Sequence, residues 1–353
     1  MLDIEQVIAN SQQLGASDIH IVCGLPIKCR VDGEIQSLND EPLSHADCEV
    51  YARALAGERY DELQNIGEID LSHSFLCGAR TRINLFRQRG SISAAVRILS
   101  DHIPELEELQ LPAVFAEFPT YRSGIVLITG ETGSGKSTTL AALLNRINRT
   151  RAGHIITLED PIEYIYTPDK CVINQREIGT DTRSYADGLR SILREDPDVI
   201  LIGEMRDLST IETAITAAET GHLVFATLHT NSAADSIDRM VNVFPDGQQK
   251  QIRLQVSTTL RAVVSQQLLR RKGGHGRIAA CEIMVVNSAI RNLIREGKTP
   301  QIDSFITMNA QNGSITMDNA LRKLVQDGAI SNETALECCR DREAFTAAAN
   351  RRF

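Results

Sequence analysis

One short stretch of the chain carries the residue types that bind phosphate. Apolar residues at 125–128 lead into a turn with the pattern G-x-x-x-x-G-K-[ST]. Glycines in this pattern let backbone N–H groups curl around oxygens, lysine reaches the β- and γ-phosphates, and the serine hydroxyl can bind Mg²⁺. The residues assigned to nucleotide binding are Gly130, Thr132, Gly133, Ser134, Gly135, Lys136, Ser137 and Thr138.

The flanks of this turn supply the context that the pattern needs. We expect a buried strand before it and a helix over 136–149 after it. A helix that begins at the turn directs unpaired N–H groups and the positive end of its dipole at the same point. A glycine-rich loop that met the pattern by chance would lack both flanks. The sequence therefore predicts a site for ATP and Mg²⁺.

Acidic residues follow two further predicted strands. Glu163 comes shortly after a strand at 154–160, and Glu204 comes after the apolar run 199–202. Open α/β sheets place their chemistry at the carboxyl ends of the strands. Glu163 could polarise an attacking water, although a solvated acidic cluster explains its segment equally well. Glu204 has the Walker B arrangement for Mg²⁺, which is a weak pattern by itself and gains weight from its place after the phosphate turn.

Two histidines bracket a predicted strand at 222–227. They are His222 and His229. A histidine at a strand end near phosphate could donate a hydrogen bond to the γ-phosphate or to a catalytic carboxylate. A single histidine is more often structural, so the residues alone leave both roles open.

The first 99 residues predict a small α+β module. Arg82 and Arg97 stand in two of its strands, beside apolar residues. An arginine in such a strand could point across an interface towards a phosphate, but strand arginines more often face solvent. The elements expected here are helices at 3–13 and 44–65 and strands at 18–23, 26–35, 69–76, 79–87 and 91–99.

A proline-containing segment at 100–122 is the expected linker, with a short helix at 112–118. The second domain then covers 123–353 and is an α/β domain with a helical C-terminal part. Its remaining expected elements are helices at 182–195 and 208–220, mostly helix over 232–270, a strand at 277–286, and helices at 289–296, 317–327 and 331–346.

The composition argues against nucleic-acid binding, membrane insertion and secretion. The net charge of −9 and an aromatic content of 4% without tryptophan disfavour a nucleic-acid partner, which surplus Lys and Arg would hold. No apolar run approaches the ~20 residues that span a bilayer, and the acidic N-terminus lacks a signal core. The eight cysteines form no C-x-x-C pair, so we expect a reduced, cytoplasmic protein.

The motifs together resemble the type II secretion/type IV pilus ATPase family. They are GETGSGKST, LEDPIEY, REDPDVILIGEMRD and TAAETGHLVFATLHTNSAADSIDR, which look like the Walker A motif, Asp box, Walker B motif and His box of that family. The segment AIRNLIRE at 289–296 is similar to a signature of the pilus retraction ATPases (PilT-like). GASDIHI and TRINLFRQRG in the N-terminal module match as well, so the resemblance covers about 14–300.

This resemblance implies a homohexameric motor with a PAS-like N-terminal domain and a RecA-like P-loop NTPase domain. It implies Glu163 as the catalytic glutamate, Glu204 as the Walker B acid, and His222 and His229 as His-box residues. Arg82 and Arg97 match arginines that contact the nucleotide phosphates when the domains close. The implied partner is an inner-membrane pilus platform protein, met at the cytoplasmic face of that membrane at the pilus base.

The expected function is pilus retraction, which disassembles the filament and powers twitching motility. The rival within the family is pilus extension or type II secretion, but the chain lacks the four-cysteine insertion and the extra N-terminal domain of those ATPases. A nucleic-acid translocase and a nucleotide-gated scaffold with little turnover are more remote alternatives. The chain departs from the family at Glu131, where proline is common, but that position contributes its backbone.

Overall fold

The structure is a computed structural model that describes residues 2–31, 33–99, 102–273 and 276–350. It consists of two compact units. The N-terminal unit comprises Met1–His102 together with the short segment Pro161–Ile165, and the C-terminal unit comprises Ile103–Asp160 and Tyr166–Phe353. The chain therefore leaves the C-terminal unit once, for five residues, and these residues include Glu163.

The N-terminal unit is an antiparallel sheet with helices on it. The strand order is β3-β2-β1-β6-β5-β4. Alternate residues of β5, among them Ile83 and Leu85, are buried against helix residues such as Tyr51 and Leu63. The helices are α1 (Ile4–Gln13), α2 (His45–Ala56) and α3 (Tyr60–Ile66), and the strands are β1 (Asp18–Ile21), β2 (Lys28–Val31), β3 (Glu34–Ser37), β4 (Glu68–Ser74), β5 (Arg80–Gln88) and β6 (Ser91–Ile98).

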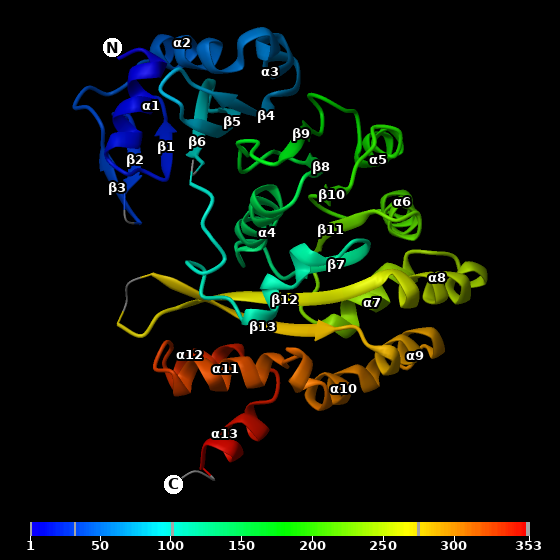
Figure 1. Cartoon of the computed structure of the whole chain (residues 1–353). Helices are drawn as coiled ribbons and strands as arrows, with labels where there is room; N and C mark the ends of the chain where they lie inside the picture. Colours follow the sequence, from blue (N-terminus) through cyan, green and yellow to red (C-terminus); the bar gives the residue numbers. More distant parts are fainter. Residues whose placement is uncertain (1, 32, 100–101, 274–275, 351–353) are drawn as a thin grey trace. The chain divides into compact units, whose positions relative to one another are not determined.

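The C-terminal unit is built on a larger sheet with the order β13-β12-β7-β11-β10-β8-β9 (Figure 1). All its neighbours are parallel except β12 and β13, which are antiparallel. Its strands are β7 (Gly124–Thr129), β8 (Gly153–Glu159), β9 (Cys171–Glu177), β10 (Val199–Ile202), β11 (Leu223–Leu228), β12 (Leu260–Arg270) and β13 (Arg277–Val285). Every residue of β7, β10 and β11 is buried, as expected for parallel strands covered on both faces.

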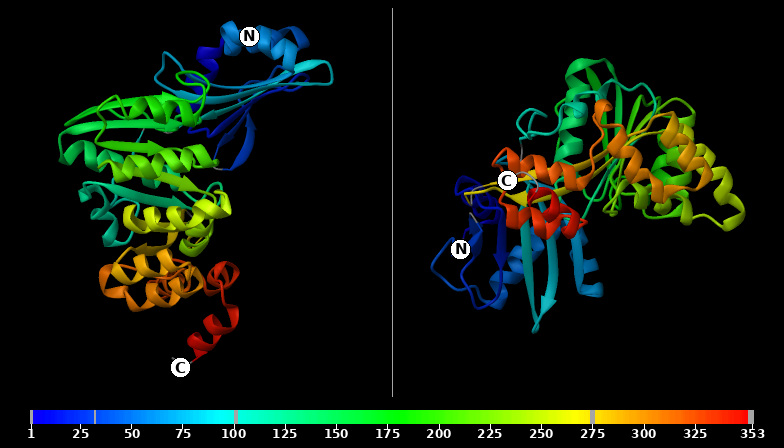
Figure 2. Two further views of the ribbon diagram at one scale, coloured as in Figure 1. Left: turned by 90° about the vertical axis from the view of Figure 1, so that its right-hand side faces the viewer. Right: turned by 90° about the horizontal axis from the view of Figure 1, so that it is seen from below.

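Helices pack on this sheet and continue past its β13 edge. The first five are α4 (Lys136–Thr150), α5 (Tyr185–Ile192), α6 (Leu208–Glu219), α7 (Ala233–Asn242) and α8 (Asp246–Thr259). The others are α9 (Ser288–Glu296), α10 (Ile302–Met308), α11 (Met317–Gln326), α12 (Asn332–Cys338) and α13 (Arg342–Asn350). The views in Figure 2 show α9 to α12 grouped beside β13.

Two sequence expectations for the C-terminal unit were wrong, and one strand was missed. Residues 260–270, expected as helix, form the long strand β12 between β7 and β13. A continuous apolar run has no period that separates a buried strand from a buried helix. The strand β9 was not predicted, because only part of it is buried. The expected helix at 331–346 is two helices, α12 and α13, separated at 339–341.

The segment expected as a linker begins with residues 100 and 101, which lie outside the described residues. From Ile103 onward it is counted with the C-terminal unit. Two 3₁₀ turns stand where a short helix was expected, at Ala113–Ala116 and Phe118–Thr120, and they bury Phe115 and Phe118. Within the parts of the chain that the structure describes, no helix combines the length and apolarity needed to cross a bilayer.

Candidate functional site

The phosphate loop connects β7 to α4, and its backbone requires glycine at two positions. Gly130 has φ of 137°, and a Cβ there would lie 2.3 Å from the carbonyl oxygen of Gln266. Gly135 is the N-cap of α4 with φ of 90°, and its Cβ would lie 2.8 Å from Nε2 of the same glutamine. Larger residues would therefore clash with β12 as well as strain the turn.

Lys136 folds back over this loop. Its Nζ donates hydrogen bonds to the carbonyl oxygens of Gly130 at 2.7 Å and Glu131 at 2.8 Å. Ser137 and Thr138 follow in the first turn of α4, half-buried. A cation, a hydroxyl and a helix N-terminus thus meet at one loop, which is the arrangement that binds a phosphate chain.

Gln266 on β12 supports the loop, and sequence reasoning missed it. The side chain is buried; its Nε2 donates to the carbonyl oxygen of Ser134 at 2.8 Å, and its Oε1 accepts from the Thr139 hydroxyl at 3.0 Å. One strand residue therefore joins the turn to the helix that follows it. The role of Gln266 could not be recognised because residues 260–270 were expected to be helical, and glutamine is common in helices.

Glu204 lies just beyond the end of β10, next to the end of β11. One carboxylate oxygen is 2.7 Å from Nη2 of Arg206, and the other is 3.3 Å from Nε2 of His229. Burial alone would raise the pKa of this carboxyl, but Arg206 and His229 hold it below its ordinary value. The structure therefore brings together two of the predicted site residues, Glu204 and His229.

A further carboxylate ends the neighbouring strand β8. Glu159 is buried and its Oε1 accepts hydrogen bonds from the Thr157 hydroxyl at 2.6 Å and from Nε2 of Gln175 at 3.3 Å. The carboxyl ends of β7, β8, β10 and β11 point the same way, because these strands are parallel. The loop, Glu159, Glu204 and His229 therefore share one edge of the sheet.

The structure does not bring His222 to that edge. This residue precedes β11, and its carbonyl oxygen accepts from the backbone N–H of Gly124, at the start of β7. Its ring Nδ1 lies 2.9 Å from the carbonyl oxygen of Ala217 and 3.1 Å from the Thr220 hydroxyl. Six strand residues separate the two histidines, so His222 lies at the opposite end of β11 from His229, and its catalytic role stays a prediction.

Glu163, Arg82 and Arg97 belong to the N-terminal unit. Arg82 on β5 is directly opposite Arg97 on β6, and Arg97 is opposite Asp18 on β1. The Arg97 Nε is 2.9 Å from a carboxylate oxygen of Asp18, while 65% of its side chain remains exposed. Like charges opposite each other weaken a sheet, and the Asp18 carboxylate offsets this for Arg97.

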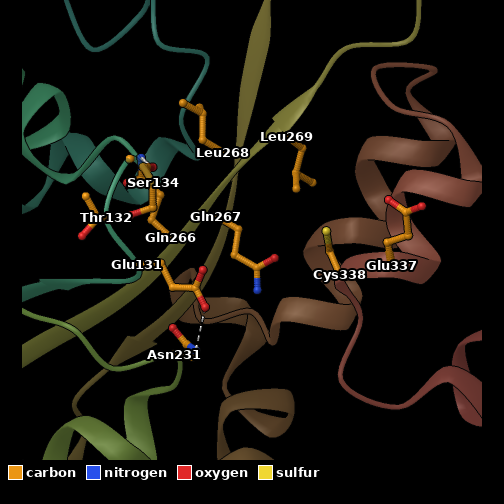
Figure 3. Close-up of a pocket in the computed structure, with 11 residues that line it drawn as sticks. Glu131, Thr132, Ser134, Asn231, Gln266, Gln267, Leu268, Leu269, Glu337 and Cys338 are labelled. Carbon is orange, nitrogen blue, oxygen red and sulfur yellow. Dashed lines mark hydrogen bonds between the residues drawn. The ribbon is translucent and has the colours of Figure 1, made fainter.

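A cavity of about 390 Å³ lies beside the phosphate loop (Figure 3). The loop forms one wall, the end of β12 forms another, and α12 forms a third. The side chains that line it are Glu131, Thr132, Ser134, Asn231, Gln266, Gln267, Leu268, Leu269, Glu337 and Cys338. Its walls combine leucines with amide and carboxylate groups.

Predicted Mg²⁺ ligands are the Ser137 hydroxyl and the Glu204 carboxylate. The described residues contain no cluster of three or more His, Cys, Asp or Glu side chains placed to hold a metal. Mg²⁺ is commonly bound through one or two protein oxygens together with phosphates and water, so it does not require such a cluster. The oxygen donors at this edge of the sheet therefore fit a Mg²⁺ ion that arrives with a nucleotide.

Comparisons with known proteins agree with this architecture. A family model described as type II/IV secretion system protein matches residues 93–337. The chain is 46% identical to the type IV pilus retraction ATPase PilT of Pseudomonas aeruginosa, over 98% of this chain and 100% of that protein. It is 44% identical to a twitching motility protein of Neisseria gonorrhoeae, over 90% and 85% of the two chains.

A solved structure has the same fold along nearly the whole chain. The crystal structure of the pilus retraction motor PilT with bound ADP superposes with a TM-score of 0.91 at 46% identity, covering 98% of this chain and 99% of that one. The family model spans more than half of the chain, and the similarity to PilT extends from end to end. The chain therefore belongs to the type II/IV secretion system protein family, among its pilus retraction ATPases.

Proposed function

We propose that the protein is a Mg-ATP-driven motor that powers retraction of type IV pili. The observation that carries this proposal is the phosphate loop with Lys136 folded over it, next to the Glu204–His229 pair at the same sheet edge. The PilT relative is named as a pilus retraction ATPase, and its solved counterpart holds ADP. We infer that the nucleoside occupies the cavity beside the loop, adjacent to its phosphates.

The mechanism rests on positioning and charge. Lys136 exchanges its bonds to the loop carbonyls for phosphate oxygens, and the loop N–H groups hold the phosphate chain. Ser137 and Glu204 would hold Mg²⁺, which would supply positive charge beside the phosphates. Glu163 orients the attacking water, and Arg82 and Arg97 stabilise the charge that develops on the transferred group, in the same chain or in a neighbouring copy.

We further propose that the motor is a homohexamer at the cytoplasmic face of the inner membrane. It acts on a pilus platform protein and has no nucleic-acid partner. Hydrolysis then moves one unit against the other, and the closed ring transmits this movement as mechanical work. The fit of this chain to PilT over both units supports a shared working assembly.

A cell-level experiment tests the direction of work. Deletion of the gene should leave surface filaments accumulated and twitching abolished, and the wild-type gene should restore both. A Lys136→Ala gene should not restore them, whereas Lys323→Ala, which removes an exposed lysine from α11, should. Loss of filaments in the deletion strain would contradict retraction and favour the extension alternative.

A further inference from the structure

Glu282 on β13 is a carboxylate with no exposed surface. One of its oxygens accepts from the backbone N–H of Ala233, at the start of α7, at 2.9 Å. The other accepts from the backbone N–H of Met317, at the start of α11, at 3.4 Å. A buried carboxylate needs a cation as well as hydrogen bonds, because burial penalises its charged form.

Arg340, between α12 and α13, supplies that cation. Its Nη1 lies 2.8 Å from one oxygen of Glu282 and its Nη2 lies 2.9 Å from the other, so the pair is bidentate. Asp303 on α10 is a second, more distant carboxylate, 3.8 Å from Nη1. The backbone N–H of Arg340 donates to Asp318 on α11 at 2.8 Å. Arg340 is therefore fixed through both its guanidinium and its backbone.

The same guanidinium reaches the loop that follows β11. Its Nη2 donates to the carbonyl oxygen of Asn231 at 2.7 Å. Asn231 stands two residues after His229, and its side-chain amide donates to the Glu131 carboxylate of the phosphate loop at 3.4 Å (Figure 3). A continuous series of contacts thus runs from the phosphate loop through Asn231 to Arg340 and the buried Glu282.

Arg340 also fixes a wall of the cavity beside the phosphate loop. It lies two residues after Cys338, which lines that cavity together with Glu337 from α12. One side chain therefore connects two cavity walls that are about 100 residues apart in the chain: Asn231, and the end of α12. Because these two walls are far apart in the sequence, a contact such as that of Arg340 is needed to hold them together.

We propose that Arg340 is a positioning residue for the nucleotide, which it holds in place by fixing the Asn231 loop and α12 around the cavity. This inference rests on the function proposed above. A buried ion pair is weak evidence for stability in itself, because apolar residues can often replace it without loss. The guanidinium is needed instead for its shape, since a planar fork can hold both Glu282 oxygens and the Asn231 carbonyl at once.

The test is Arg340→Lys in the full-length protein. Lysine keeps a positive charge for Glu282 but is a point charge without the planar fork, so it cannot hold all three acceptors. Arg322→Lys is the matched control: Arg322 on α11 donates to Asn319 and to the Ala344 carbonyl and packs on the Phe345 ring, all within the C-terminal helices.

We expect Arg340→Lys to lower kcat/KM for ATP by about tenfold, equivalent to roughly 1.4 kcal/mol. Most of the change should be a higher KM, because the cavity walls contact the nucleotide in the ground state and the transition state alike. Arg322→Lys should leave both constants unchanged. Unchanged constants in Arg340→Lys, or the same KM increase in both variants, would overturn the proposal.

Asn231→Ala gives a second measurement that leaves the buried ion pair intact. It removes the contact with Glu131 while the Asn231 carbonyl stays available to Arg340. If Arg340 acts through this loop, the double variant should have a KM close to that of Arg340→Lys alone; full additivity would contradict the coupling. Failure of the proposed ATP site would look different, because the wild-type protein itself would then neither bind nor hydrolyse ATP. Failure of the retraction function alone would appear only in the filament experiment.

Discussion

The two units hold their predicted site residues in different ways. In the C-terminal unit these side chains are held by hydrogen bonds or ion pairs. Lys136 contacts two loop carbonyls, Gln266 contacts the loop and α4, and Glu204 lies between Arg206 and His229. In the N-terminal unit, Arg82 is exposed and Arg97 is held by Asp18 with most of its side chain in solvent. The comparison shows that the C-terminal unit fixes its predicted site residues by internal contacts, whereas the N-terminal unit leaves its two arginines largely exposed.

The largest effect should come from the exposed arginines. Arg97→Ala, and separately Arg82→Ala, should lower kcat by roughly 10³-fold, the lower end of what a cation on a transferred phosphoryl group contributes. Steady-state phosphate release measures this. Arg87→Ala is the control, since Arg87 is an exposed arginine of the same strand on its other face. Unchanged kcat in Arg82→Ala and Arg97→Ala would show that neither arginine contributes to catalysis.

The next prediction concerns the phosphate loop of the C-terminal unit. Gln266→Leu leaves the Ser134 carbonyl and the Thr139 hydroxyl without their partner, at a cost of ~1–3 kcal/mol. Because the loss falls on the phosphate loop, we expect weaker ATP binding, measured by calorimetry, rather than general unfolding. Gln267→Leu changes the adjacent residue of β12 and should weaken binding less, since it makes neither contact. Equal affinities in both variants and the wild type would show that the loop keeps its shape without β12.

The two histidines give a smaller and sharper contrast. His229→Ala removes a contact with Glu204 and should lower kcat about tenfold, as expected for a hydrogen bond to a charged group. His222→Ala alters the opposite end of β11 and should change kcat less than about twofold, within the range of ordinary surface substitutions. A larger loss in His222→Ala than in His229→Ala would contradict the roles that their positions at opposite ends of β11 favour.

The smallest effect is on stability against acid. The pKa of Glu204 lies below its usual 4.5 in the folded protein, so the unfolded state binds this proton first. Its stabilising contribution is complete above about pH 4.5 and is lost as the pH falls through the lowered value. Thermal melts of wild type and Glu204→Gln should therefore differ most above that pH and converge below it. A difference that grows as the pH falls would contradict the direction of the shift.

Sequence reasoning succeeded where local chemistry is self-contained. The phosphate loop, the strand before it and the helix after it follow from a few consecutive residues, and so does the acid after β10. The family and the α/β architecture were also predicted, and the comparisons confirm them. These features need no knowledge of which strand lies next to which.

Sequence reasoning was less successful where a residue's role depends on which strands lie next to each other. Gln266 matters only because β12 lies beside β7, and a buried apolar run does not reveal that neighbour. His222 and His229 look equivalent in sequence, yet the direction of β11 separates them. The contacts of Arg340 join residues more than 50 positions apart. The assignments of Glu163, Arg82, Arg97 and His222 stay predictions, and the arginine and histidine variants above test the last three of them.

The most direct test of the account is equilibrium binding of a non-hydrolysable ATP analogue with Mg²⁺ to Lys136→Ala, beside wild type and Lys323→Ala. We expect wild type and Lys323→Ala to bind alike, and Lys136→Ala to lose at least about tenfold in affinity, because a charge-assisted contact of ~1.5–3 kcal/mol disappears. Wild-type affinity in Lys136→Ala would show that the nucleotide is held somewhere other than at the phosphate loop.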